Sequence, residues 1–290
     1  MPTNFSKEAN DLETFSAGLD ALETSKRQKT NWSKRILTSI APLLAIVVII
    51  AVWEAFYKAK VVEDWILPGP GQVFHSLKLQ FDQHLLVESA FNSLRKGAQG
   101  FAISLVIATI VGLLLGTNKV LRVIFRPILT GLQQLPSVAW VPASIIWFGL
   151  SDQTLFAVVL LGAVPSIANG LISGIDQIPP IYLKAGKVLG AKGFSKTWHI
   201  LIPAAWPGFL QGLEQGWAFA WRSLMAAELI AVSPELGPGL GQMLDTGRQL
   251  GDMALVLGAI LTIMITGVLI ERLVFTPVRT STLRNRGLIS

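Results

Sequence analysis

The sequence contains no cysteine, so disulfide bonds and thiolate-bound metals are excluded. Its three histidines are scattered and do not show the spacing of metal ligands. The chain also lacks the G-x-x-x-x-G-K-[ST] loop that binds nucleotide phosphates, and the H-E-x-x-H and G-x-S-x-G motifs of hydrolases. We therefore predict no catalytic site, metal site or cofactor on this chain, and any nucleotide chemistry would belong to a partner.

Charged residues are also scarce, at 14% of the chain against roughly 25% in ordinary soluble domains. Hydrophobic residues make up 51%, the mean hydropathy is +0.54, and the apolar residues form long blocks. Such blocks suit lipid as the surrounding solvent. The net charge of +6 does not indicate a nucleic-acid partner, because the basic residues border the apolar blocks, where they report membrane topology.

Six apolar blocks are long enough to cross a bilayer as helices, which takes about 20 residues each. We therefore predict an all-α integral membrane protein with spans over residues 36–57, 94–116, 124–150, 154–172, 204–232 and 253–275. Most lysine and arginine residues outside these spans then fall on the same side as the N-terminus. This bias predicts a multi-pass protein with both termini in the cytoplasm.

The segments around these spans suggest how the chain is divided. Residues 1–35 are predicted to be a disordered cytoplasmic tail, because they are polar and bury little apolar surface. Residues 36–93 hold the first span and an amphipathic extracytoplasmic segment, 94–275 the membrane core, and 276–290 a basic cytoplasmic tail. The second span carries small residues that predict close helix packing, namely Gly97, Gly100, Gly112 and Gly116.

Two prolines, Pro136 and Pro142, interrupt the third block. A proline removes a helical hydrogen bond, which lipid tolerates only if neighbouring groups or water satisfy the freed carbonyl. The block should therefore kink and face the protein interior or a cavity. The sequence leaves two interpretations open, a structural kink alone or the lining of a translocation path.

The fifth block carries charges inside an otherwise apolar stretch. On a helix, Glu214, Trp217, Trp221 and Glu228 fall within one stripe of about 60°, and Arg222 lies beside it. Ionisable groups at membrane depth should face the bundle interior or a wet path. Either the three charges pair with each other or with neighbouring helices, or Arg222 attracts an anion while the two tryptophans shape a gate.

The polar stretch between the fourth and fifth blocks predicts a short helix, a turn and a second short helix. Gly190 can adopt the positive φ that such a turn requires. Pro203 would close the loop where a new helix begins just after it. Four lysines, Lys184, Lys187, Lys192 and Lys196, should lie outside the bilayer.

This stretch resembles the cytoplasmic coupling loop of ABC importer permeases, whose pattern is E-A-A, three residues, G, nine residues, I, one residue, L-P. The matching positions are Lys184-Ala185-Gly186, Gly190, Ile200 and Ile202-Pro203, and Lys187 lies among them. The spacing matches throughout, but Lys184, Gly186 and Ile202 stand where the family has Glu, Ala and Leu. Further segments resemble the nitrate, sulfonate, taurine and bicarbonate subgroup, namely 67–70, 136–142, 148–149, 226–229 and 237–241.

The resemblance implies a type I importer-like permease that carries a small anion or zwitterion, with an aliphatic sulfonate such as taurine favoured over nitrate or bicarbonate. It implies a prokaryotic plasma membrane, a second permease copy, an extracytoplasmic substrate-binding protein, and an ATPase subunit that holds ATP and Mg and receives the loop at 180–203. Two rivals remain. An ion-gradient-driven secondary transporter would use Glu214 and Glu228 as ion sites, and a structural membrane assembly protein would explain the small-residue helix faces.

Overall fold

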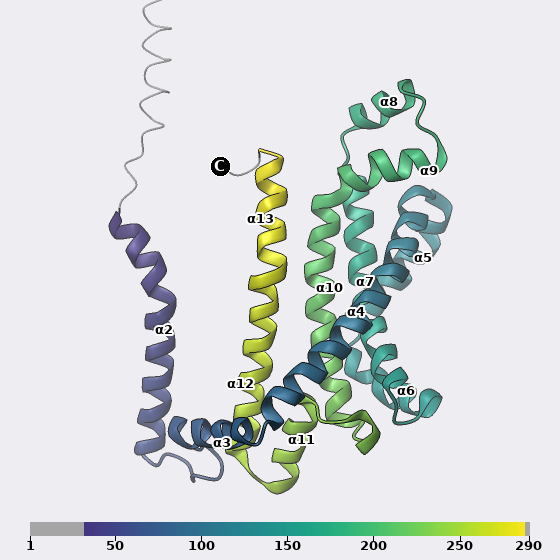
Figure 1. Cartoon of the computed structure of the whole chain (residues 1–290). Coiled ribbons are helices and arrows are strands. Elements are labelled where there is room, and N and C mark those ends of the chain that lie inside the picture. The colour runs from purple at the N-terminus through teal and green to yellow at the C-terminus, as the bar shows by residue number, and fades with distance from the viewer. Residues whose placement is uncertain (1–31, 288–290) are drawn as a thin grey trace, which may run out of the picture. The chain divides into compact units, whose positions relative to one another are not determined.

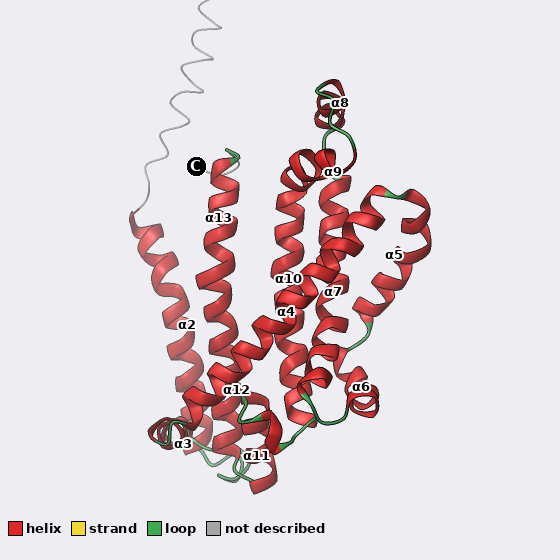
Figure 2. Ribbon diagram, turned by 45° about the vertical axis from the view of Figure 1, so that its right-hand side comes forward, coloured by secondary structure: helices red, strands yellow, loops and turns green. Residues whose placement is uncertain are grey.

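The computed structural model describes residues 32–287, and every regular element within them is a helix (Figure 2). The predicted tail at 1–35 therefore lies, up to residue 31, outside the described part of the chain. The chain divides into two compact units, Met1–Ala59 and Lys60–Ser290. The first unit contains α2 (Trp32–Lys58), a helix of 27 residues that includes the predicted first span and carries a Glu54–Lys58 ion pair in its last turn.

The second unit begins with α3 (Pro70–Asp82) and ends with α13 (Thr276–Asn285) (Figure 1). The helices between them are α4 (Leu85–Thr117), α5 (Lys119–Gln134), α6 (Val141–Phe148), α7 (Asp152–Asp176), α8 (Pro180–Val188), α9 (Gly193–Lys196), α10 (Ile202–Ile230), α11 (Leu240–Leu250) and α12 (Met253–Ile270). Short 3-10 turns occupy η1 (Ser137–Trp140) and η3 (Pro234–Leu236), and π-helical turns occupy η2 (Thr197–Leu201) and η4 (Glu271–Phe275).

The core of this unit lies around α7, which packs most extensively against α10 and α4. Leu155, Val159, Ile167 and Leu171 of α7 are fully buried. The glycines of α4 form the packing face expected from the sequence. A β-carbon on Gly100 would lie 2.9 Å from Val159, and one on Gly112 would lie 3.0 Å from Leu171.

The contact between α7 and α10 brings backbone against backbone. A β-carbon on Gly170 would lie 2.3 Å from the α-carbon of Gly212, and one on Gly208 would lie 2.5 Å from the α-carbon of Gly174. Lipid supplies no hydrophobic force between helices, so close van der Waals packing of small residues holds such pairs together. We call these four residues the glycine seam.

Three helices of the described residues are long and apolar enough to cross a membrane: α4, α7 and the continuous helix Met253–Asn285. That last helix contains the predicted sixth span, and it joins α12, η4 and α13 without a break. The segment after Phe275 is therefore helical up to Asn285. The count of six spans stays a prediction.

The predicted third span is wrong as a single kinked helix. Helix α5 ends at Gln134, and Leu135 is extended with ψ 131° because a residue before proline disfavours the helical region. Pro136 precedes η1, and Pro142 lies in the first turn of α6, where its missing N–H disrupts nothing. Residues 124–150 thus form two helices, of which α6 has only eight residues.

Helix α4 begins at Leu85, ahead of the predicted start of the second span at residue 94. The first turns of α4 are polar in sequence, but Ser89, Ser93 and Lys96 are buried there. A buried polar group is tolerated when it is hydrogen-bonded, and Ser93 and Lys96 both are. The polar side chains of this stretch therefore form buried contacts within the protein.

Candidate functional site

The loop between α7 and α10 folds as a short helix, a tight turn and a second short helix. Gly190 has φ +77°, which is the left-handed conformation that glycine adopts readily. Its N–H donates to the carbonyl of Lys187, and the N–H of Ala191 donates to the carbonyl of Gly186. These two bonds close α8 as a Schellman motif, so Gly190 fixes the direction in which the chain leaves α8.

The sequence predicts a new helix that begins just after Pro203; α10 begins at Ile202 with Pro203 in its first turn, but it does not follow a break in the helix. The chain is helical from Gly193 onward, because α9 leads through the π turn η2 directly into α10. A π turn already departs from the α-helical hydrogen-bond pattern, and Pro203 lies directly after it, where its missing N–H is tolerated. The second arm of the loop is therefore continuous with α10.

A cleft of about 730 Å³ lies at the base of this loop, and we call it the loop cleft. Four residues that carry the family resemblance line it: Ala185, Gly186, Ile200 and Pro203. Gly186 is buried, and a β-carbon there would lie 2.0 Å from the end of the Ile200 side chain. The guanidinium of Arg286 also lines the cleft and donates to the carbonyl of Pro203.

The other residues of that set lie elsewhere on the loop. Lys184, Lys187 and Gly190 are exposed, and Ile202 is half-buried. None of these four lines the loop cleft. The structure thus divides the sequence-predicted set into four residues that line the loop cleft and four that do not.

The charges of α10 do not pair with each other. Glu214 forms an ion pair with Arg279 of α13, in which Oε2 of Glu214 lies 3.3 Å from Nη1 of Arg279. Arg222 is exposed, and its guanidinium lies 4.7 Å from the ring centroid of Phe219. The sequence left open whether these charges pair with each other or with neighbouring helices. Glu214 and Glu228 contact neighbouring helices, through Arg279 and Ser93 respectively. Arg222 forms no ion pair with any of the described residues.

Three members of the predicted stripe and the neighbouring Arg222 meet in a pocket of about 440 Å³ between α10 and the helix 253–285, which we call the α10 pocket. Glu214, Trp217, Trp221 and Arg222 form one wall, and the opposite wall includes Glu271. The rings of Trp217 and Trp221 stack with their centroids 6.1 Å apart. Among the described residues, neither Trp217 Nε1 nor Glu214 Oε1 has a hydrogen-bond partner.

The remaining predicted residues lie outside this pocket. Pro136 and Pro142 are exposed and form no part of its wall, and Glu228 lies beyond it toward the end of α10. No group of three histidine, aspartate or glutamate residues capable of holding a metal occurs in residues 32–287.

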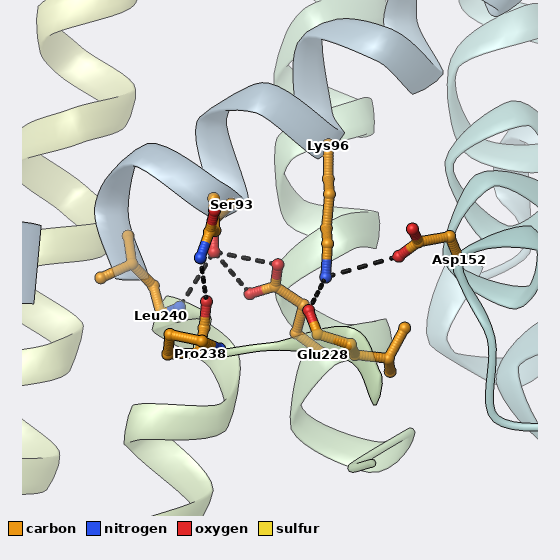
Figure 3. Close-up of polar contacts among 8 residues, drawn as sticks. Ser93, Lys96, Asp152, Glu228, Pro238 and Leu240 are labelled. Carbon is orange, nitrogen blue, oxygen red and sulfur yellow. Dashed lines mark hydrogen bonds and ion pairs between the residues drawn. The ribbon is translucent and has the colours of Figure 1, made fainter. Parts of the chain in front are cut away.

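Glu228 is instead the centre of a buried polar cluster (Figure 3). Its carboxylate is 1% exposed and accepts from Ser93 Oγ at 2.7 and 2.9 Å and from the N–H of Gly241 at 3.0 Å. The N–H of Leu240 donates in turn to Ser93 Oγ at 2.9 Å. These bonds join α4, α10 and the start of α11.

Lys96 extends this cluster toward α7 (Figure 3). Its ammonium is buried, donates to the carbonyl of Leu236 at 2.5 Å and lies 3.5 Å from Asp152. The sequence pointed to Glu228 but not to Ser93, Lys96 or Asp152, because these residues come from segments far from Glu228 in the chain. One sequence signal for the cluster was the glycine-rich segment 237–241. In the structure, a β-carbon on Gly239 or Gly241 would collide with Glu228.

Comparison with known proteins gives one consistent result. Residues 104–275 match the family described as the binding-protein-dependent transport system inner membrane component. The chain is 30% identical over 250 residues to a putative ABC transporter permease protein of Methanocaldococcus jannaschii, covering 84% of this chain and 90% of the relative.

Two further relatives have more specific names. The taurine transport system permease protein of Escherichia coli is 27% identical over 254 residues, which cover 85% of this chain and 90% of the relative. The bicarbonate transport system permease protein of Synechococcus elongatus is 26% identical over 254 residues, which cover 84% and 89%. Both match nearly their whole length.

Proposed function

The chain belongs to the family of binding-protein-dependent transport system inner membrane components, and from this premise we propose that it is the permease subunit of an ATP-driven importer. It carries a small anion or zwitterion into the cytoplasm by alternating access. An aliphatic sulfonate such as taurine is favoured over nitrate or bicarbonate, and the relatives named for taurine and bicarbonate support this substrate class.

The permease has no catalytic site in this proposal, and ATP and Mg bind a separate ATPase subunit. The family description, which names binding-protein dependence, supports a further partner, an extracytoplasmic substrate-binding protein. The working complex contains two permease copies and two ATPase subunits in the plasma membrane of a prokaryote, with both permease termini in the cytoplasm. Lipid surrounds the helices.

The observation that carries this proposal is the connection between the loop and the bundle. One arm of the loop follows α7 after three residues, and the other continues into α10. Since the glycine seam holds α7 and α10 backbone to backbone, a force applied to the loop moves both helices as one body. This is the arrangement that a partner needs to couple its own closure to a change of access.

The test is recovery of an ATPase with the tagged chain from native membranes, followed by ATP hydrolysis in lipid. Gly190→Pro should lose the ATPase, because proline fixes φ near −65° and cannot adopt +77°. Gly251→Pro is the matched control, since Gly251 has φ +68° in the turn between α11 and α12. It should disturb that turn equally and leave ATPase recovery intact.

If the folded chain purifies alone and is indifferent to Gly190→Pro, the importer proposal fails. Uptake that then persists without ATP but collapses with a protonophore would identify a gradient-driven transporter.

We place the substrate path at the α10 pocket. Arg222 supplies a positive charge for the anionic group, and the stacked Trp217 and Trp221 form a narrow apolar wall beside it. Arg222→Gln should lower uptake about tenfold or more, since a charged hydrogen-bond partner is lost. Arg284→Gln, which removes an exposed charge from α13, is the control. An Arg222→Gln complex that assembles and transports normally would remove this assignment.

A further inference from the structure

The loop between α7 and α10 carries charge of only one sign. Lys184, Lys187, Lys192 and Lys196 are all exposed, and residues 177–213 contain no aspartate or glutamate. We call these four residues the lysine face. The nearest acid before them, Asp176, is already engaged, because Arg122 forms a bidentate ion pair with it and Arg126 lies 3.8 Å away.

No carboxylate within residues 32–287 comes within ion-pair distance of the lysine face. Four ammonium groups on one short loop repel each other, and the repulsion is relieved only by solvent, salt or an acidic partner. The positive charge is therefore a property that the loop presents outward. A partner of negative charge would be attracted to it, and a positive one would be rejected.

Apolar side chains lie between these lysines. Val188 and Leu189, next to the turn, are 87% and 85% exposed. Phe194 and Trp198 are also exposed, and their rings stack with centroids 6.1 Å apart. An exposed apolar patch rimmed by polar residues marks an interaction surface, and aromatic residues are enriched at the centres of such surfaces.

The direction of the loop favours a protein over a lipid surface. Helix α7 is a candidate membrane span. Figure 1 shows α8 lying past the ends of α7 and α10, at the far end of this part of the molecule. Helix α8 thus lies on the side away from a bilayer that α7 crosses, so a partner in solution meets it first.

We propose that the lysine face docks into an acidic groove on the ATPase subunit, with Asp or Glu side chains opposite Lys184 and Lys187 and an apolar floor for Val188 and Leu189. This inference rests on the proposed function and adds the chemistry of the partner. The permease thereby selects its own ATPase by charge, and an ATPase whose groove is basic is rejected.

The experiment uses the tagged full-length chain in its native host, so that all subunits are present. The double substitution Lys184→Glu and Lys187→Glu should lower recovery of the co-purifying ATP-binding cassette protein about tenfold, because two attractive contacts become repulsive. The matched control reverses two exposed charges elsewhere, Lys119→Glu and Arg284→Glu, and should keep recovery near that of the wild type. Size-exclusion chromatography confirms that each variant is folded.

A zero-length carbodiimide cross-link gives an independent readout, because it joins a lysine amine only to a carboxylate in direct contact. Lys184 or Lys187 should form such a bond with an acid of the ATPase. Replacing that acid with lysine should restore recovery of the doubly substituted permease. This reciprocal rescue distinguishes a specific charge contact from general damage to the loop.

Three results separate the possible failures. If the wild type recovers no ATPase, the proposed function itself fails. If the double variant keeps its ATPase while Gly190→Pro loses it, the importer stands and the acidic groove is refuted. If the double variant keeps its ATPase but loses binding to phosphatidylglycerol vesicles, the lysine face contacts lipid and the proposal is likewise refuted.

Discussion

The two ends of α10 are held in place by opposite means. Near the loop, the glycine seam brings the backbones of α10 and α7 into direct van der Waals contact. At the other end, Glu228 joins α10 to α4 and α11 through hydrogen bonds from Ser93 and Gly241. The first contact tolerates no added atom, whereas the second tolerates no lost donor or acceptor.

The difference shows how a membrane helix can be packed tightly at one end and held in a single arrangement by hydrogen bonds at the other. Close packing transmits displacement because packed backbones are hard to deform. A polar cluster selects one arrangement, since each alternative leaves a buried group without a partner. In the proposed importer, the seam carries the motion of the loop, and the cluster fixes where the opposite end of α10 lies.

The largest effect is expected for Glu228→Ala. It leaves Ser93 Oγ and the N–H of Gly241 without their acceptor and the buried Lys96 with less compensating charge. Breaking a buried charged network in this way costs about 3–5 kcal/mol. Thermal unfolding in detergent, followed by tryptophan fluorescence, should show a large drop in midpoint. Glu228→Gln keeps one hydrogen-bond acceptor, so its unfolding midpoint should drop clearly less. An equal drop for the two variants would refute the hydrogen-bond explanation.

Gly170→Ala should come next, at about 1–3 kcal/mol, because its β-carbon meets the backbone of Gly212 and not a movable side chain. Gly131→Ala in α5 is the matched control, since nothing lies within 4 Å of its β-carbon. That control should be neutral or stabilising by up to about 1 kcal/mol, as for alanine in a helix. A seam variant as stable as the control would contradict the close packing.

Ser93→Ala tests the polar cluster at its middle. The change leaves the N–H of Leu240 without an acceptor and removes a donor to Glu228, which should cost about 1–3 kcal/mol. A double variant with Glu228→Ala should cost far less than the sum of the two single changes, because both remove the same contact. Additive losses would show that the two residues act independently.

The smallest effect is expected for Arg279→Gln, which breaks the ion pair with Glu214. Both side chains reach solvent, at 49% and 20% exposure, so stability should fall by less than about 1 kcal/mol. Uptake is the informative measurement here. If transport falls sharply while the unfolding midpoint holds, the pair belongs to the substrate path and not only to the packing of α13.

The sequence predicted individual helices better than their contacts. The bounds of α7 and α10 lie within a few residues of the expected spans, because hydropathy reports on a single helix and its solvent. The turn at Gly190 was predictable because its cause is local, a positive φ.

Contacts between helices depend on residues far apart in the chain. Ser93 and Glu228 are separated by 135 positions, and neither segment contains a pattern that predicts contact with the other. Lys96 shows a related limit, because hydropathy associates a charge with water although this one is buried. The break at Pro136 shows the same limit, because a proline predicts lost hydrogen bonding but not whether the helix bends or ends.

The two π turns also make the molecule sensitive to the number of residues in its chain. A π turn holds one residue more than the α-helical turn it replaces, so it accommodates an extra residue within one turn. Deleting one residue from Thr197–Leu201 would let that turn become α-helical and would leave α9 and Lys196 facing nearly the same side. Deleting one residue from the regular α-helical part of α10 would instead rotate everything before it by about 100° about the helix axis.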